Sequence, residues 1–458
     1  MGLKDTLIRD VSEQEAKSLE KRYRRRKISR TEKSKEFEES FVEQTRKNLG
    51  SMQGSKNRAK GMAYFDHIIS GQRLKEIEQE RKKGKKVIGF MCALVPQELI
   101  LAAGAVPVRL CSGFYDTCDI AEDALPRDIC PLAKSTFGNK LLEIEFFKHC
   151  DAVVIPASCD AKKKLGEVLA DYMPVFAMDL PSVRDTEKSK RYWLSEVKDF
   201  KANLEELTGR KIGKKELEGA VSLLYERTRA FRRLYEIRKS PRTVVSEKDA
   251  MLVANTAFFD EPARWTQKAN ELCNELEESM KKGLEVADSG APRILITGSA
   301  IIWPNYKILD VAEQSGLNIV IDQLCSGTEF LYEPVEVDEK THEDMLSAVA
   351  ERYLLPSMCP VFFTWDDRAD RILEMAEQFK VQGVVYHTLR LCQIFDMESE
   401  GIRQALQEKK IPVLKVLTDY SYEDVEQIRT RMEAFREMLT SRGKERQASS
   451  EKSKKVEK

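Results

Sequence analysis

The sequence has ten cysteines but only four histidines and no Cys-x-x-Cys pair among its 458 residues. The histidines show no HExxH spacing, and Cys111 and Cys118 stand seven positions apart. Structural zinc sites and thioredoxin-like redox sites need closely spaced thiols or imidazoles. The sequence therefore disfavours both. It also lacks GxGxxG, GxxxxGK[ST] and GxSxG motifs, so nucleotide-binding and serine-hydrolase motifs are absent.

The chain also lacks net charge and long apolar runs. Lys+Arg and Asp+Glu number 76 each, so there is no overall attraction to nucleic acid or to an anionic membrane. The basic run KRYRRRKISR (21–30) fits a charged helical face. No apolar stretch approaches the ~20 residues of a membrane span, and the first residues lack a signal peptide's apolar segment. We expect a cytoplasmic protein with reduced thiols and with neither nucleic acid nor membrane as partner.

Short β-branched runs alternate with helix-length segments in two regions of the chain. VIGFM, AVVIP and VFAM lie in the first region, and ILITG, NIVID, VVYHT and VLKVL lie in the second. This alternation predicts two doubly wound α/β domains with mostly parallel sheets. The predicted organisation is a charged helical amino-terminal extension of solvated helices, a first α/β domain, a connecting segment of long amphipathic helices, a second α/β domain and a disordered tail (1–85, 86–189, 190–289, 290–440 and 441–458).

Four cysteines follow predicted strands directly, and two more lie in proline-bearing loops. The first four are Cys92, Cys159, Cys325 and Cys392, and the other two are Cys130 and Cys359. Parallel sheets build their sites at the carboxyl ends of their strands. A single free cysteine is more often a buried packing residue. Six such positions together, with few histidines, favour an iron–sulfur cluster over zinc.

The remaining cysteines and the polar residues near these positions receive structural roles. Cys118 and Cys273 are expected in helices, and Cys111 and Cys150 are also taken as structural. Glu98 and Ser158 are expected to cap or to pack, so no catalytic residue is assigned. Lys162, Lys163 and Lys164 fit either an anion or reduced-cluster contact or the basic first turn of a surface helix.

Several motifs resemble one family in the same order along the chain. They are FMCALVPQELILAAGAVPVRLCSG, AEDALPRDICPLAKSTFG, VIPASCDAKKK, IDQLCSGTEF, LLPSMCP and LRLCQIFDMES. Over roughly residues 86–440 the sequence is similar to the 2-hydroxyacyl-CoA dehydratase D-component family. This family includes benzoyl-CoA reductase subunits and double-cubane-cluster anaerobic reductases.

The resemblance implies an oxygen-sensitive enzyme with a 4Fe–4S cluster in the cleft between two α/β domains. By motif, its three cysteine ligands fall on Cys130, Cys159 and Cys392, and the fourth iron is open. The resemblance further implies an ATP-dependent activator that delivers one low-potential electron for ketyl-radical dehydration of a 2-hydroxyacyl-CoA. It also implies a homodimer, or a heterodimer with a homologous subunit.

Two alternatives remain at the level of the sequence. The double-cubane relatives use six cysteines to reduce small substrates with ATP, and Cys325 and Cys359 would supply two more ligands. Where that branch has a sixth cysteine, this chain has Ile144, and Cys92 and Cys150 are the nearest replacements. The second alternative is a non-catalytic cluster-binding scaffold or maturation factor. The acyl group, and whether the substrate is a CoA thioester, stay open.

Overall fold

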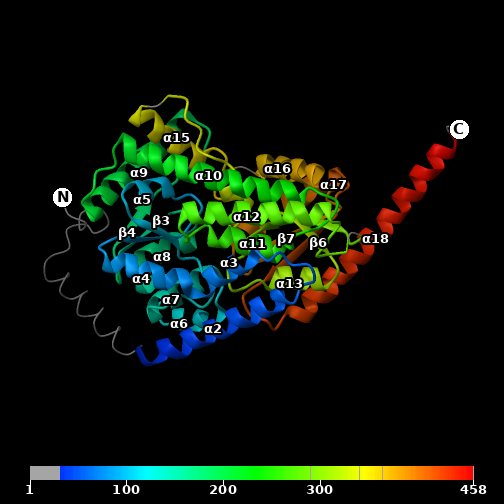
Figure 1. Cartoon of the computed structure of the whole chain (residues 1–458), viewed down its shortest axis with the longest axis horizontal. Coiled ribbons are helices and arrows are strands. Elements are labelled where there is room, and N and C mark those ends of the chain that lie inside the picture. The colour runs from blue at the N-terminus through cyan, green and yellow to red at the C-terminus, as the bar shows by residue number, and fades with distance from the viewer. Residues whose placement is uncertain (1–30, 289, 340, 364, 457–458) are drawn as a thin grey trace.

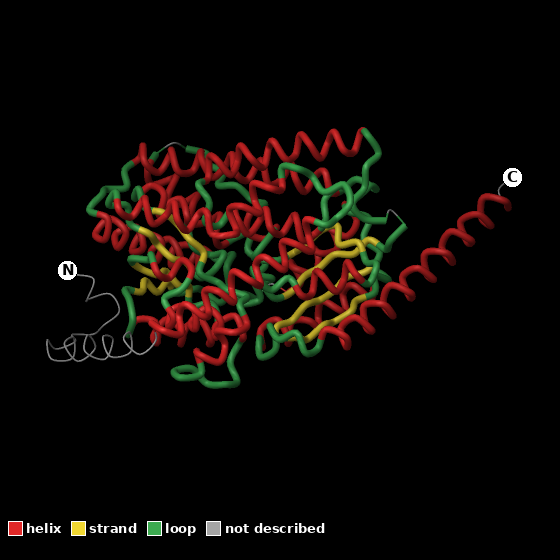
Figure 2. Tube along the Cα trace, turned by 60° about the horizontal axis from the view of Figure 1, so that its bottom comes forward, coloured by secondary structure: helices red, strands yellow, loops and turns green. Residues whose placement is uncertain are grey.

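The computed structural model describes residues 31–456 except 289, 340 and 364. The basic run 21–30 therefore lies outside the described residues. Two separate groups of strands are surrounded by helices, and a long carboxy-terminal helix extends away from the body (Figures 1 and 2). Within the described part of the chain, no helix is both long enough and apolar enough to cross a bilayer.

The first sheet has four parallel strands in the order β2-β1-β3-β4. Nearly every strand residue is buried, which explains why these segments appear as continuous apolar runs in the sequence. The strands and the helices that follow them are β1 (Val87–Phe90), α5 (Gln97–Ala102), β2 (Val106–Arg109), α7 (Pro131–Leu142), β3 (Ala152–Pro156), α8 (Asp160–Ala170) and β4 (Val175–Met178).

The second sheet repeats this order as β6-β5-β7-β8, again with every pairing parallel. The prediction of two doubly wound α/β units is thus confirmed, and both sheets are entirely parallel. The elements are β5 (Arg293–Gly298), α13 (Lys307–Gln314), β6 (Asn318–Gln323), α15 (His342–Leu354), α16 (Trp365–Gln378), β7 (Gly383–Leu389), α17 (Gln393–Glu408) and β8 (Val413–Thr418).

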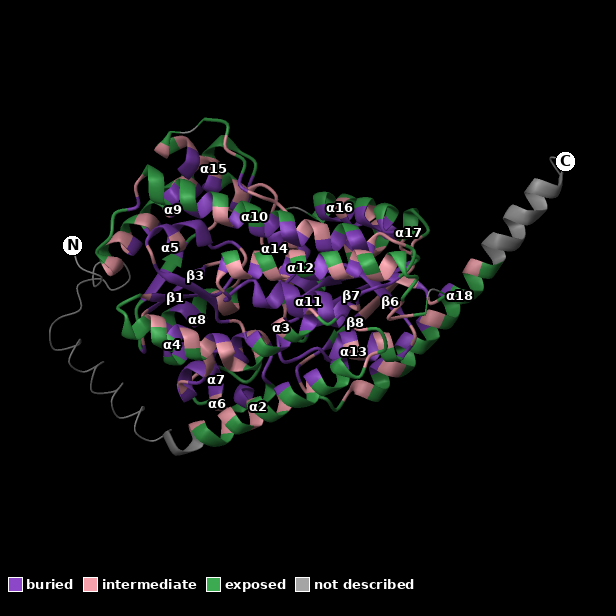
Figure 3. Cartoon of the chain, viewed as in Figure 1, coloured by how far each residue is buried: buried purple, intermediate pink, exposed green. Residues whose placement is uncertain are grey.

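Four helices lie between the two sheets in the chain: α9 (Glu187–Thr208), α10 (Lys214–Arg238), α11 (Glu247–Thr256) and α12 (Pro262–Lys281). Helix α10 packs on α5, on α12 and on α15, so it connects the two halves (Figure 1). All ten residues of α11 are buried, as the purple ribbon in Figure 3 shows. Helix α11 is therefore a central core helix rather than an amphipathic surface helix.

The helices before the first sheet are α2 (Thr31–Gln53), α3 (Met62–His67) and α4 (Arg73–Lys82), with a π-turn, η1 (Ile68–Gln72), between the last two. The expectation that they are merely solvated is wrong, because Met62, Phe65 and Ile77 are fully buried. These apolar side chains belong to the main hydrophobic core. In addition, the guanidinium of Arg58 forms buried ion pairs with Asp66 and Asp249 at 2.7 Å each.

The remaining elements are short, apart from the last helix. They are η2 (Tyr115–Thr117), α6 (Cys118–Ala121), η3 (Glu145–Lys148) and α14 (Thr328–Leu331). Disorder was predicted for the tail at 441–458, whereas α18 (Val425–Val456) extends into this region as far as Val456. The tail has no proline and is rich in Glu, Lys and Arg, a composition that is compatible with a helix.

Candidate functional site

Three cysteines of the first half lie just beyond the carboxyl ends of adjacent strands. Cys92 follows β1, Cys111 follows β2 and Cys159 follows β3. After β1 the chain forms β2 on one side of it, and it then crosses to form β3 on the other side. The crevice between β1 and β3 is therefore the topological switch point of this sheet. Cys92 and Cys159 flank that crevice.

The second half supplies its cysteines in the same way. Cys325 follows β6 and Cys392 follows β7, next to the corresponding switch point between β5 and β7. Cys359 lies in the loop before α16. The carboxyl edges of both sheets therefore contribute thiols, as their positions in the sequence predicted.

Cys130, Cys159 and Cys392 share one local geometry, since each is the N-cap residue of a helix: α7, α8 and α17, respectively. The first backbone N–H groups of these helices face the sulfurs and favour the thiolate form, as those of Leu132 and Lys162 do for Cys130 and Cys159. At these three thiols the helix amino termini therefore offset part of the cost that burial imposes on the thiolate form.

These three thiols come from distant parts of the chain and interact with one another. The Cys392 thiol donates toward the Cys130 sulfur and lowers the pKa of Cys130, while the same interaction raises the pKa of Cys392. Cys159 is near enough to influence both electrostatically. Burial raises the pKa of Cys159. The trio implied by the sequence motifs is therefore brought together by the fold.

Lys162 lies among the thiols, whereas Lys163 and Lys164 are exposed on α8. Burial opposes the charge of Lys162, but the nearby Cys92 and Cys159 outweigh this effect and raise the pKa of Lys162. Cys111 and Cys325 act on it in the same direction. Only the first of the three lysines therefore faces the site.

Arg109, the last residue of β2, is a second cation beside the thiols. Its Nη1 donates to the Cys325 carbonyl at 3.0 Å, and its Nη2 lies 3.8 Å from the Cys325 sulfur. Cys111 and Cys92 also lie close enough to stabilise its charge. The buried Arg109 and the half-buried Lys162 thus lie beside a group of thiols from both halves.

The candidate ligands beyond the trio separate clearly. Cys92 is near enough to influence both Cys325 and Cys359, and all three interact electrostatically with Lys162, so they belong to one group of thiols. Cys150 does not, because the charged groups nearest it are Lys140 and Asp151 rather than other thiols. Ile144 is fully buried in an apolar cluster with Phe114 and Leu142.

Cys111 is the member of the group for which the sequence predicted only a structural role. It acts on both Arg109 and Lys162 from the end of β2. The available signal was its position after the run VPVR, which matches the positions of Cys92 and Cys159. Cys118 and Cys273 lie within α6 and α12, as predicted.

The donor set is made of sulfur. Burial raises the pKa of Cys325 to about 11 and raises that of Cys359 as well, so these thiols must lose protons when a metal binds. Among the described residues, no three His, Cys, Asp or Glu side chains converge to hold a single metal ion. A cubane does not need such convergence, because each thiolate binds a different iron. Dispersed thiols beside two cations fit a cluster better than a single ion.

Comparison with known proteins identifies the family of this chain. The family model described as 2-hydroxyglutaryl-CoA dehydratase, D-component, matches residues 92–439. YjiM of Escherichia coli (strain K12) is 33% identical over 366 residues, which cover 78% of this chain and 93% of YjiM. The (R)-phenyllactyl-CoA dehydratase beta subunit of Clostridium sporogenes is 24% identical and covers 82% of this chain and 97% of its own length.

A third relative is a subunit of benzoyl-CoA reductase from Thauera aromatica. It is 24% identical over 343 residues, which cover 73% of this chain and 86% of the relative. The chain therefore belongs to the 2-hydroxyglutaryl-CoA dehydratase D-component family, a family of dehydratase subunits and related reductase subunits. The family assignment made from the motifs is confirmed.

Proposed function

We propose that this chain is the iron–sulfur subunit of a 2-hydroxyacyl-CoA dehydratase-like enzyme, with a 4Fe–4S cluster held by Cys130, Cys159 and Cys392. The observation that carries the proposal is that these three thiols, each at a helix amino terminus, interact although they are up to 262 residues apart. Membership of the D-component family supports the reaction class.

When bound, the cluster would supply a low-potential electron to the thioester, and an open iron would act as a Lewis acid. The protein's own groups would hold it and tune it. The amino termini of α7, α8 and α17 favour thiolates, and Lys162 and Arg109 offset negative charge. In the proposed reaction, one electron added to the thioester carbonyl allows the 2-hydroxyl group to leave.

The proposed partners are a homologous subunit and an ATP-dependent activator that delivers the electron in the cytoplasm. Three of the dehydratase relatives carry beta-subunit names, which supports a heterodimer over a homodimer. Phe363 and Met397 are exposed by 84% and 79% on segments that follow Cys359 and Cys392. Exposed apolar side chains near the site support a covering partner there. We further propose that 86–189 and 290–440 act as two domains joined by 190–289.

A double-cubane reductase of small substrates is the second candidate. It is favoured by the position of Cys92, Cys325 and Cys359 in the same group as the trio. With the trio, Cys325 and Cys359 as five ligands, the sixth would be Cys92 or Cys111, because Cys150 lies apart from the other thiols.

Iron and sulfide content after anaerobic purification tests these proposals. About four irons per chain supports the dehydratase form, and about eight supports the double cubane. Absence of iron after reconstitution would overturn both. The scaffold alternative would be favoured if the activator reduces the cluster but acyl-CoA substrates then fail to oxidise it.

Replacing Cys159 with Ala should remove or destabilise the cluster, which is measured by iron content and by visible absorption. The matched control is Cys273→Ala, because Cys273 is fully buried in α12 away from the other thiols. The control should keep its iron. Equal iron in the wild type and in Cys159→Ala would refute the proposed ligand.

A further inference from the structure

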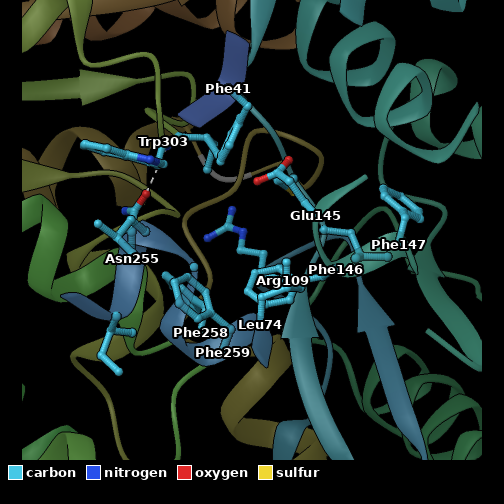
Figure 4. A pocket seen from close by; sticks show the side chains of 16 residues that line it. Phe41, Leu74, Arg109, Glu145, Phe146, Phe147, Asn255, Phe258, Phe259 and Trp303 are labelled. Carbon is cyan, nitrogen blue, oxygen red and sulfur yellow. Dashed lines mark hydrogen bonds between the residues drawn. The ribbon is translucent and has the colours of Figure 1, made fainter. Parts of the chain in front are cut away.

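A cavity of about 90 Å³ lies beside the clustered cysteine thiols described above, where segments of both halves meet. Its wall is mainly aromatic and apolar (Figure 4), and it includes Phe146, Phe258, Phe259, Ile302 and Trp303. Cys111 also lines it. Since typical small-molecule sites occupy ~300 Å³ or more, this cavity suits a fragment rather than a whole cofactor.

Arg109 points into this cavity from the end of β2 (Figure 4). Its side chain stacks on Phe258, with 4.6 Å between the guanidinium carbon and the ring centroid. Only 8% of the residue is exposed, yet its Nε has no hydrogen-bond partner among the described residues. A buried donor without a partner is costly, so this N–H group indicates a missing acceptor.

Glu145 enters the same cavity from η3 (Figure 4). It forms no ion pair with Arg109 within the described chain, and its partners are Asn139 and Ser112. Its φ of 52° is in the left-handed region, an uncommon conformation for a residue with a side chain, and it holds the carboxyl group there. Burial raises the pKa of Glu145 to about 8, which makes the protonated, donating form the major one at neutral pH.

The cavity therefore combines an apolar wall with two hydrogen-bond donors, one of them cationic. The chemistry that fits is a small apolar group that carries an oxygen acceptor. Arg109 also contacts Cys325, so an acceptor bound at Arg109 would lie next to the clustered cysteine thiols.

We propose that this cavity binds the acyl portion of the substrate, with an acyl oxygen accepting hydrogen bonds from Arg109 Nε and from Glu145. The inference rests on the proposed function for the identity of the acyl group. The binding chemistry itself needs no cluster, because the wall and both donors belong to the polypeptide. The volume excludes the nucleotide portion of a CoA ester and limits the acyl group to a few carbons, because a cavity that holds benzene alone measures ~150 Å³.

Binding of isobutyrate to the full chain, measured by calorimetry without a cluster, tests the proposal. Isopentane has a similar branched chain without an acceptor, and formate has the acceptor without the chain. We expect isobutyrate to bind at least tenfold more tightly than either. Isopentane binding as tightly as isobutyrate would overturn the role of Arg109, and failure of isobutyrate to bind would overturn the site.

Leu74→Phe should weaken isobutyrate binding at least tenfold, because Leu74 lines the cavity and the phenylalanine ring would fill it. The matched control Leu194→Phe changes a partly buried leucine of α9 and should leave binding unchanged. Equal affinity in both variants would overturn the assigned cavity. A chain that binds isobutyrate but never iron would refute the proposed function alone, whereas a chain that binds iron but not isobutyrate would refute the cavity alone.

Discussion

Removing the charge of Lys162 should lower the reduction potential of the proposed cluster. Lys162 is the one lysine of the run at 162–164 that faces the thiols, whereas Lys163 is exposed on the same turn of α8. Lys162→Gln and Lys163→Gln therefore remove the same charge from neighbouring positions. A cation stabilises the reduced, more negative cluster, so its loss makes reduction harder.

The expected size follows from Coulomb's law. At an effective dielectric constant of about 20, two unit charges about 4 Å apart interact by about 4 kcal/mol, and doubling the separation halves this energy to about 2 kcal/mol. For a one-electron couple this energy corresponds to ~90 mV. At the exposed Lys163 the field is screened by water, and we expect less than about 20 mV.

The assay is an anaerobic redox titration followed by electron paramagnetic resonance, after iron content is shown to be equal. Equal shifts in the two variants, or no shift in Lys162→Gln, would refute the assigned role of Lys162. A second readout uses protein without a cluster. Because Lys162 lowers the pKa of Cys159, Lys162→Gln should slow alkylation of Cys159, and Lys163→Gln should not.

Two further predictions concern stability. Gly298→Ala should reduce the free energy of unfolding by more than about 2 kcal/mol, because φ is 115° and an added Cβ would lie 1.9 Å from the His387 carbonyl oxygen. Denaturant titration measures this change. Glu145→Gln should flatten the pH dependence of stability. The pKa of Glu145 is raised to about 8 in the fold, so its contribution is present below about pH 4.5 and is lost as pH rises toward 8. Melting temperature from pH 5 to pH 8 measures the slope.

Each of these predictions has its own control. Gly219→Ala in α10 meets no atom within 4 Å and should stabilise the protein by up to about 1 kcal/mol. A similar loss in both glycine variants would contradict the steric argument. Equal pH slopes in the wild type and in Glu145→Gln would show that this carboxyl group is not protonated in the fold.

The sequence alone determined the fold class and the edge at which the site lies. Strands buried on both faces must appear as apolar runs, and parallel strands bring their carboxyl ends to one edge. The positions of Cys92, Cys159, Cys325 and Cys392 after such runs were therefore sufficient to place them. Periodicity was insufficient for the charged helices at 31–85 and for α11, because a few apolar contacts or a central position decide burial whatever the average composition.

Only the tertiary structure decided which side chains meet. Cys111 lies among the clustered thiols and Cys150 does not. Lys162 faces these thiols, whereas Lys163 and Lys164 face solvent. The meeting of Arg109 with Glu145 across one cavity has no local signal in the sequence either. Such contacts depend on how separate strands and helices pack, and that packing is set by the whole core rather than by spacing along the chain.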